Sequence, residues 1–182
     1  KSALGAGITH GAAVAVTITE ATTAANLLND VNGLTDGTVT VQSSRVTGNY
    51  TDVAAALSAN AATPVDGNTI SGMDAINATL DNSNGGTVSY TPLEIRVVSA
   101  RTTGIVTATA SSGDPTALLN ATTGLAETGH AITIVVTDDT PTAAELKTLD
   151  TLTTEVITLT PADPTAHSIT GSATDLLSLI HI

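Results

Sequence analysis

Short apolar stretches with alternating polar positions recur along the chain, and this pattern is typical of half-buried β-strands. They predict strands near residues 14–19, 38–42, 68–71, 87–90, 94–99, 105–109, 131–137, 155–160 and 167–170. Other stretches have apolar residues three or four positions apart and predict helices near 22–31, 50–61, 73–81, 115–122, 141–150 and 172–180. Each helix is only about two to three turns long, so it must pack on its neighbours to persist in water.

Several short motifs occur more than once. Residues 46–53, VTGNYTDV, align without gaps on residues 169–176, ITGSATDL, and ISGMD at 70–74 is a shorter version. TAANL at 23–27 aligns on TAAEL at 142–146, and GTV occurs at 37–39 and 86–88. One strand–helix segment cannot bury its own apolar side, whereas stacked segments share a continuous core. The sequence therefore predicts a mixed α/β repeat array, a solenoid-like stack of about six units whose strands form one or two sheets.

The spacing of the motifs suggests how the chain is organised. Residues 1–13 are expected to be an N-terminal linker or assembly arm, and residues 14–182 a degenerate array of strand–helix repeats. Residues 91–104 lie in a longer gap between predicted helices and mark a candidate internal boundary. Thr91-Pro92 favours a turn or an edge position, so this gap is expected to hold a hairpin or an extra pair of strands.

The supply of core residues is narrow. The chain has no Phe, Trp or Cys and one Met, and its only aromatic residues are Tyr50 and Tyr90. Large rings normally fill wide gaps between packed layers. The interior must therefore be thin and built from Val, Ile, Leu and Ala, which suits a repetitive array.

Charge excludes some functions. The chain has 17 acidic and five basic residues, a formal net charge of −12. Nucleic-acid binding needs clustered cations, so no nucleic-acid partner is expected. Residues 2–19 are almost uncharged but lack the apolar density of a membrane-spanning helix, so membrane insertion is not expected either. An acidic, Thr-rich, Lys-poor and Cys-free chain is typical of secreted bacterial proteins, which predicts an extracellular or cell-surface location.

Candidate catalytic residues are sparse. His10, His130, His167 and His181 lie far apart, without the i, i+4 spacing of a zinc-binding helix. No G-x-S-x-G motif is present to position a nucleophilic serine. The histidines are interpreted as surface or turn residues, and the chain is not expected to be an enzyme.

Two oxygen-rich loops are candidate calcium sites. Asp81, Asn82 and Asn84 form one, and Asp138 and Asp139 form the other. Calcium takes six to eight oxygen ligands, including backbone carbonyls. Neither loop matches the register of a helix–loop–helix calcium site, and such residues also form turns and helix caps. Calcium is thus a candidate ligand, and no cofactor is required.

Thr and Asn form two further patterns. Thr recurs two residues apart in TIT at 17–19, TVT at 38–40, TAT at 107–109 and TLT at 158–160, which places Thr on one face of each strand. Such rows could bind ice or a carbohydrate, although strand propensity alone also favours Thr and the uneven spacing opposes a flat surface. Asn49, Asn77 and Asn120 begin N-x-T sequences, which are candidate glycosylation acceptors.

The segments ITGSATDLLSL and VVTDDTPTAAELKTLDTLTTEVITL resemble the Thr/Ala/Asp-rich repeats of giant secreted surface proteins of cyanobacteria and other marine bacteria. Those proteins are often described as adhesins or as haemolysin-like. The resemblance implies an extracellular structural or adhesive role and a ligand on a cell or another surface. The glycine- and aspartate-rich nonapeptide of haemolysin-type calcium repeats is missing here, so the resemblance does not extend to calcium binding.

The ends of a repeat array expose unpaired strand edges and apolar side chains unless they are capped. We expect two apolar groups to be buried against neighbouring copies: Val14, Val16 and Ile18 near one end, and Leu176, Leu177, Leu179, Ile180 and Ile182 near the other. Head-to-tail contacts of this kind generate filaments. The predicted function is a non-enzymatic extracellular structural protein, either a subunit of a filament or sheath or a segment of a surface adhesin. The alternative is an ice- or carbohydrate-binding domain that uses the Thr-rich strand faces.

Overall fold

The computed structural model describes residues 13–60, 69–82, 86–163, 165 and 167–179. The chain divides into two compact units, Lys1–Val88 with Val98–Ile105, and Ser89–Val97 with Val106–Ile182. Each unit is a mixed arrangement of short helices and parallel strands. This confirms the predicted α/β class. Among the described residues, no helix has both the length and the apolar character needed to cross a membrane.

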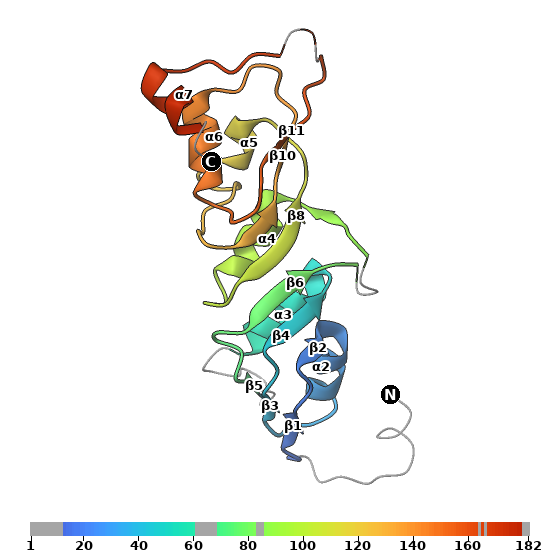
Figure 1. Ribbon diagram of the computed structural model, residues 1–182. Coiled ribbons are helices and arrows are strands. Elements are labelled where there is room, and N and C mark those ends of the chain that lie inside the picture. The colour runs from blue at the N-terminus through green and yellow to red at the C-terminus, as the bar shows by residue number, and fades with distance from the viewer. Residues whose placement is uncertain (1–12, 61–68, 83–85, 164, 166, 180–182) are drawn as a thin grey trace. The chain divides into compact units, whose positions relative to one another are not determined.

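Two sets of parallel strands build the first unit (Figure 1). Strands β1 (Val16–Ile18), β3 (Val39–Val41) and β5 (Ile70–Ser71) pair in that order, and so do β2 (Thr22–Ala24), β4 (Arg45–Gly48) and β6 (Asn77–Leu80). Helix α2 (Ala25–Asn32) follows β2 directly, and α3 (Tyr50–Ala59) begins just after β4. The order strand, strand, helix thus occurs twice. We call β1, β2 and α2 the first module, and β3, β4 and α3 the second module.

The two modules lie against each other in register. Val16 pairs with Val39, 23 positions later, and Thr22 pairs with Arg45 at the same separation. Helices α2 and α3 pack together, and Asn29 Nδ2 donates to the Asp52 carbonyl at 2.9 Å. Along the strands, inward Val, Ile and Ala alternate with outward Thr, Ser and Asn, as the two-residue period requires. The core is therefore thin and aliphatic, as the composition predicts.

The second unit also uses parallel pairing. Its elements follow in the order β7 (Ser89–Tyr90), α4 (Pro92–Ser99), β8 (Val106–Ala110), α5 (Pro115–Leu118), β9 (Ala131–Thr133), β10 (Val135–Val136), α6 (Ala143–Asp150), β11 (Thr158–Leu159) and α7 (Ala173–Leu179). Strand β8 lies between β7 and β9, and β10 pairs with β11. Helix α6 contacts α5 and α7, which are drawn beside it in Figure 1.

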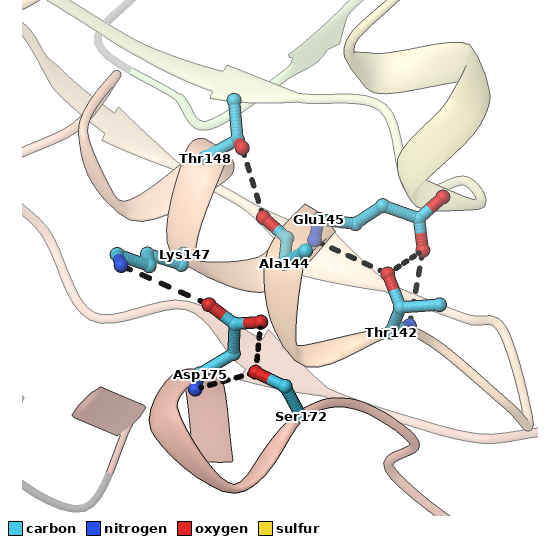
Figure 2. Close-up of polar contacts among 7 residues, drawn as sticks. All are labelled: Thr142, Ala144, Glu145, Lys147, Thr148, Ser172 and Asp175. Carbon is cyan, nitrogen blue, oxygen red and sulfur yellow. Dashed lines mark hydrogen bonds and ion pairs between the residues drawn. The ribbon is translucent and has the colours of Figure 1, made fainter. Parts of the chain in front are cut away.

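The same capping interaction begins most of the helices. Thr142 and Glu145 form a reciprocal capping box at α6, and Ser172 Oγ accepts the Asp175 amide at 3.2 Å at α7 (Figure 2). Asn49 and Asp52 form the equivalent pair at α3, with Asn49 Oδ1 accepting the Asp52 amide at 3.0 Å. Because this pair satisfies helix N–H groups that have no partner inside the helix, it explains why NYTD and SATD recur.

The contacts in Figure 2 also join α6 to α7. Lys147 Nζ lies 3.9 Å from Asp175 Oδ1, so the acidic cap of α7 faces a cation on α6. Hydrogen bonds from the Thr142 hydroxyl and amide lower the pKa of the Glu145 carboxyl, because they stabilise its charged form. The carboxylate therefore keeps its capping role at any pH above its ordinary titration range.

Some predicted elements are wrong. Residues 73–81 were expected to be helical, but residues 77–80 form β6, in which Ala78 and Leu80 are buried and their neighbours are not. The two-residue period overrides the resemblance of ISGMD to the other helix-start motifs. The predicted helix 22–31 begins late, because its first three residues form β2. Strand β4 was not among the predicted strands, although its last three residues are the VTG that precedes α3.

The segment 91–104 also differs from expectation. Residues 94–99 were predicted as a strand because they are rich in β-branched residues, but they lie in helix α4. Thr91 and Glu94 form a capping box, with the Thr91 amide donating to Glu94 Oε2 at 2.8 Å, and Pro92 occupies the first turn. The hairpin is absent from this described stretch, but the alternative, an extra pair of strands, is present: β7 and β8 flank α4 and pair in parallel. At 167–170, where a strand was predicted, only a bridge between Thr142 and Thr170 is present.

Candidate functional site

An apolar groove opens beside the first strand of the first unit. Among the residues that the structure describes, strand β1 is one edge of its sheet, and the groove, about 500 Å³ in volume, lies between β1, β2 and α2. Its apolar lining includes Ile18, Leu27 and Leu34, and Leu27 is 59% exposed. Glu20 and Asp30 also line it and give it an acidic rim. We call this surface the leading edge.

A second apolar hollow lies beside the last strand of the second unit. It has a volume of about 400 Å³ and is lined by Leu146, Ile157, Leu159 and Ile169 among others. Val156, just before β11, also lines it and is 85% exposed. Asp150 and Glu155 provide an acidic rim here too. We call this surface the trailing edge.

Backbone hydrogen bonds show which groups face the open side of each edge. The Val16 amide donates to Thr38 O at 3.1 Å and Ile18 O accepts from Gln42 N at 2.9 Å, so these residues face β3. Successive residues of a strand face opposite neighbours, and Thr17 therefore directs its amide and carbonyl to the open side. In β11, Thr158 N donates to Ile134 O at 3.0 Å, so the flanking residues 157 and 159 face the open side.

The predicted interface residues fall partly on these edges. Val14, Val16 and Ile18 lie in or next to β1, where Val14 is exposed and the other two are half-buried. Leu176 is half-buried and Leu177 exposed in α7, which packs on α6. Nothing is described for Ile180, Ile182 or the side chain of Leu179. The prediction missed β11 and the end of α6.

A sequence signal for the trailing edge exists. The triplets VTI at 16–18, VTV at 39–41 and ITL at 157–159 share the order apolar, Thr, apolar. The first two form paired strands β1 and β3. The third includes β11, but the same order also occurs at 78–80, 106–108 and 132–134, so this triplet identifies β11 as a strand without marking it as an edge.

Three buried threonines tie neighbouring segments together within the units. The Thr102 hydroxyl donates to Ile76 O and the Thr153 hydroxyl to Ile132 O, each at 2.6 Å, and Thr35 makes the same contact with Val14 O. Each hydroxyl also accepts the amide two residues later, from Gly104, Glu155 and Gly37 respectively. The common pattern is Thr-x-(Gly/Glu)-x-(Val/Ile), and the GTV at residues 37–39 is its last part.

His130 is buried, contrary to its interpretation as a surface or turn residue. Its Nδ1 accepts the Val106 amide at 3.2 Å, and its carbonyl accepts the Thr154 amide at 2.9 Å. Because Nδ1 is an acceptor, the neutral ring carries its proton on Nε2. Burial lowers the pKa of His130, and the Glu127 carboxylate partly opposes this shift. This histidine therefore acts as a neutral structural link. His167 is half-buried, and His10 and His181 lie outside the described residues.

Several of the candidate calcium ligands accept hydrogen bonds from backbone amides. Asn82 Oδ1 accepts the Gly86 amide at 2.8 Å, while Asn84 lies outside the described residues. Asp138 Oδ1 accepts the Thr140 amide and Asp139 Oδ1 the Asp163 amide, each at 3.0 Å. Among the residues that the structure describes, no three acidic or His side chains are grouped to hold a metal ion. Asn82 and Asp138 thus hold local turns, Asp139 joins two segments 24 residues apart, and calcium binding stays a prediction.

Several of the predicted Thr rows lie in register. Thr17, Thr40 and Ser71 pair across β1, β3 and β5, and Ser71 Oγ lies 3.5 Å from Thr40 Oγ1. In the second unit, Ser89, Thr109 and Thr133 form an equivalent row across β7, β8 and β9. Each row places hydroxyl groups on the side of the strands opposite the buried Val, Ile and Ala.

The N-x-T sequences occupy three different environments. Asn49 caps α3, and Asn77 lies in β6 with its Oδ1 accepting the Ile105 amide at 2.8 Å. Asn120 is exposed in a turn, where its Oδ1 accepts from Thr122 and Thr123. Two of these asparagines were placed in predicted helices, yet none lies inside one.

Comparison with known proteins identifies no relative: no family model matches the chain, and no curated protein or solved structure matches it. The resemblance to surface-protein repeats stays a prediction. The functional argument therefore depends on the two edges themselves.

Proposed function

We propose that this chain is a non-enzymatic extracellular structural protein that self-associates through its sheet edges, either as the subunit of a filament or sheath or as a segment of a surface adhesin. Its strand–helix segments would continue from one copy to the next as a solenoid-like stack. The observation that carries the proposal is that the two units present two open apolar edges, one at β1 and one at β11.

The first unit indicates what such an edge accepts. Val39 and Val41 of β3 are 0% and 4% exposed, because β3 has β1 on one side and β5 on the other. Val16 and Ile18 occupy the equivalent inward positions of β1 and are only half-buried. Another parallel strand on the open side of β1 would complete the burial of Val16 and Ile18 and would pair the free backbone edge of β1. Burial of apolar area favours association by about 25 cal/mol per Å².

Self-association can be tested on the purified chain. We expect sedimentation or light scattering to show a mass that grows with protein concentration, and negative-stain microscopy to show elongated particles. A concentration-independent monomer throughout the micromolar range would contradict the proposal.

The rows of hydroxyl groups favour a second candidate function, an ice- or carbohydrate-binding domain. Neighbouring strands lie about 4.8 Å apart, so each row spaces its hydroxyl groups regularly. Thermal hysteresis, or retention on an insoluble polysaccharide, would support this function if replacing Thr40 by Val abolished it. A dispersed monomer with thermal hysteresis would favour this candidate over the structural one.

A further inference from the structure

We infer that the trailing edge of one copy adds in parallel to the leading edge of the next, with Thr158 opposite Thr17. This inference rests on the proposed self-association and names its interface. The occupant of each groove is thus a second copy of this chain, bound head to tail.

The backbone groups on the two edges are complementary. In a parallel pair, the residue that faces its partner bonds to the two residues that flank its opposite number. Thr17 faces the open side of β1, and residues 157 and 159 face the open side of β11, as the bonds from Val16 N and Thr158 N establish. With Thr158 opposite Thr17, the Thr17 amide would donate to Ile157 O and its carbonyl would accept from Leu159 N. A shift by one residue would place Thr17 opposite residue 157 or 159. The two residues that Thr17 would then need as partners direct their backbone groups toward β10, so pairing would be prevented.

The side chains agree with the same register. Ile157 and Leu159 would lie beside Val16 and Ile18, as Val39 and Val41 do across β1 and β3. All four edge residues are half-buried in the single chain, and the neighbouring strand would bury them further. The outward row of Thr17, Thr40 and Ser71 would gain Thr158 as a fourth member. The contact therefore reproduces a packing that the first unit already contains.

Charge determines the conditions for association. Glu20 and Asp30 line one groove, and Asp150 and Glu155 line the other, so acidic rims would meet. The chain also has a net charge of −12. Repulsion between exposed like charges is screened as ionic strength rises, since the screening length falls from about 10 Å at 0.1 M to about 3 Å at 1 M salt. We expect association to strengthen between 0.1 and 1 M NaCl, whereas contacts held by opposite charges would weaken.

Disulfide cross-linking tests the register, because the natural chain contains no cysteine. Thr17→Cys and Thr158→Cys are prepared as two separate variants, at two exposed positions. Adjacent parallel strands bring such Cα atoms within the range of about 4.4–6.8 Å that a disulfide spans. Mild oxidation of the mixture should give a cross-linked dimer at least tenfold faster than either variant alone. Replacing the second variant with Thr160→Cys, two residues further along, should abolish this advantage.

A second experiment tests the head-to-tail polarity without cysteines. Leu27→Glu blocks the leading edge and Val156→Glu the trailing edge, and both side chains are largely exposed, so the fold should be retained. Each variant alone should remain monomeric, whereas an equimolar mixture should form a one-to-one dimer and nothing larger. Ile105→Glu, half-exposed and outside both grooves, carries the same charge change and should associate like the natural chain.

The outcomes separate this inference from the proposed function. If the natural chain associates but the cysteine mixture gains no advantage, or if both blocked variants still form polymers, the head-to-tail interface is wrong and self-association stands. If the natural chain stays monomeric up to 1 M NaCl, both ideas fail. A dimer formed by Thr17→Cys alone would indicate a symmetric contact between two leading edges and would also overturn the inference.

Discussion

The first and second modules have the same order of elements but different surroundings. Both contain an apolar–Thr–apolar strand, a second strand and a short helix, and they pair residue by residue. In the second module, β3 lies between two strands and α3 buries Val53, Ala54, Ala56 and Leu57. In the first module, β1 has one neighbour and α2 buries only Ala25 and Leu28. The number of neighbours decides how much of each module is buried.

The two helices also differ in how they begin. Helix α3 has Asn49 as its cap, whereas α2 begins at Ala24, which makes no side-chain capping bond. Every helix here is too short to be stable alone, so packing must supply what the local sequence does not. The first module has a weaker start to its helix and less packing, and we expect it to be the less stable of the two.

The largest effect on stability is expected from truncating a fully buried side chain of the first module. Leu28 is 0% exposed, and Leu28→Ala should lower the free energy of unfolding by about 2–5 kcal/mol, because it leaves a cavity in the thin core. Leu27→Ala, on the next residue of the same helix, should change it by less than about 0.5 kcal/mol. Urea denaturation followed by circular dichroism measures both. Equal losses would mean that α2 does not pack as described.

The next largest effect on stability is expected at Thr35, which precedes the second module and bonds to Val14, just before the first module. Thr35→Val keeps the shape but removes the hydroxyl that binds Val14 O and the Gly37 amide, leaving two partly buried backbone groups without this partner. The expected loss is about 1–3 kcal/mol. Thr35→Ser should recover most of it, and Thr38→Val, at an exposed position nearby, should cost little. If Thr38→Val lowered the free energy of unfolding as much as Thr35→Val, the hydrogen bonds of Thr35 would not be the cause of the loss.

Two substitutions at helix caps should change the stability by smaller amounts and in opposite directions. Asn49→Ala removes the cap of α3 and should cost about 1 kcal/mol. Ala24 has the extended backbone of a cap position, with φ −75° and ψ 129°, so Ala24→Ser should stabilise the first module by several tenths of a kcal/mol, up to about 1. Thermal unfolding should show Tm moving in opposite directions for the two variants. If Ala24→Ser lowers Tm, packing at β2 outweighs the gain from a cap.

The smallest effect is expected from pH. Burial lowers the pKa of His130 below its ordinary value of 6.5, so the unfolded chain binds a proton more readily than the folded one. The stabilisation is complete above pH 6.5 and is lost as the pH falls below that value. His130→Asn keeps an acceptor for the Val106 amide but cannot titrate. The stability of the natural chain should fall more steeply than that of the variant between pH 6.5 and 5, and parallel curves would contradict this.

Local chemistry determined much of the fold. The two-residue alternation identified β3 and β8, and the recurring motifs VTGNYTDV and ITGSATDL identified the starts of α3 and α7. The absence of large rings indicated a thin aliphatic core. These features can be predicted from the sequence because each depends on neighbouring residues of the chain.

Contacts between distant residues decided the rest. Residues 77–80 became a strand because they pair with β4, about 30 residues earlier in the chain. The burial of His130 depends on Val106 and Thr153, more than 20 residues away in the chain. The trailing edge likewise exists only because β11 pairs with β10 on one side. Periodicity identifies the side chains that can be buried, but only the tertiary structure determines which of them gain a neighbour.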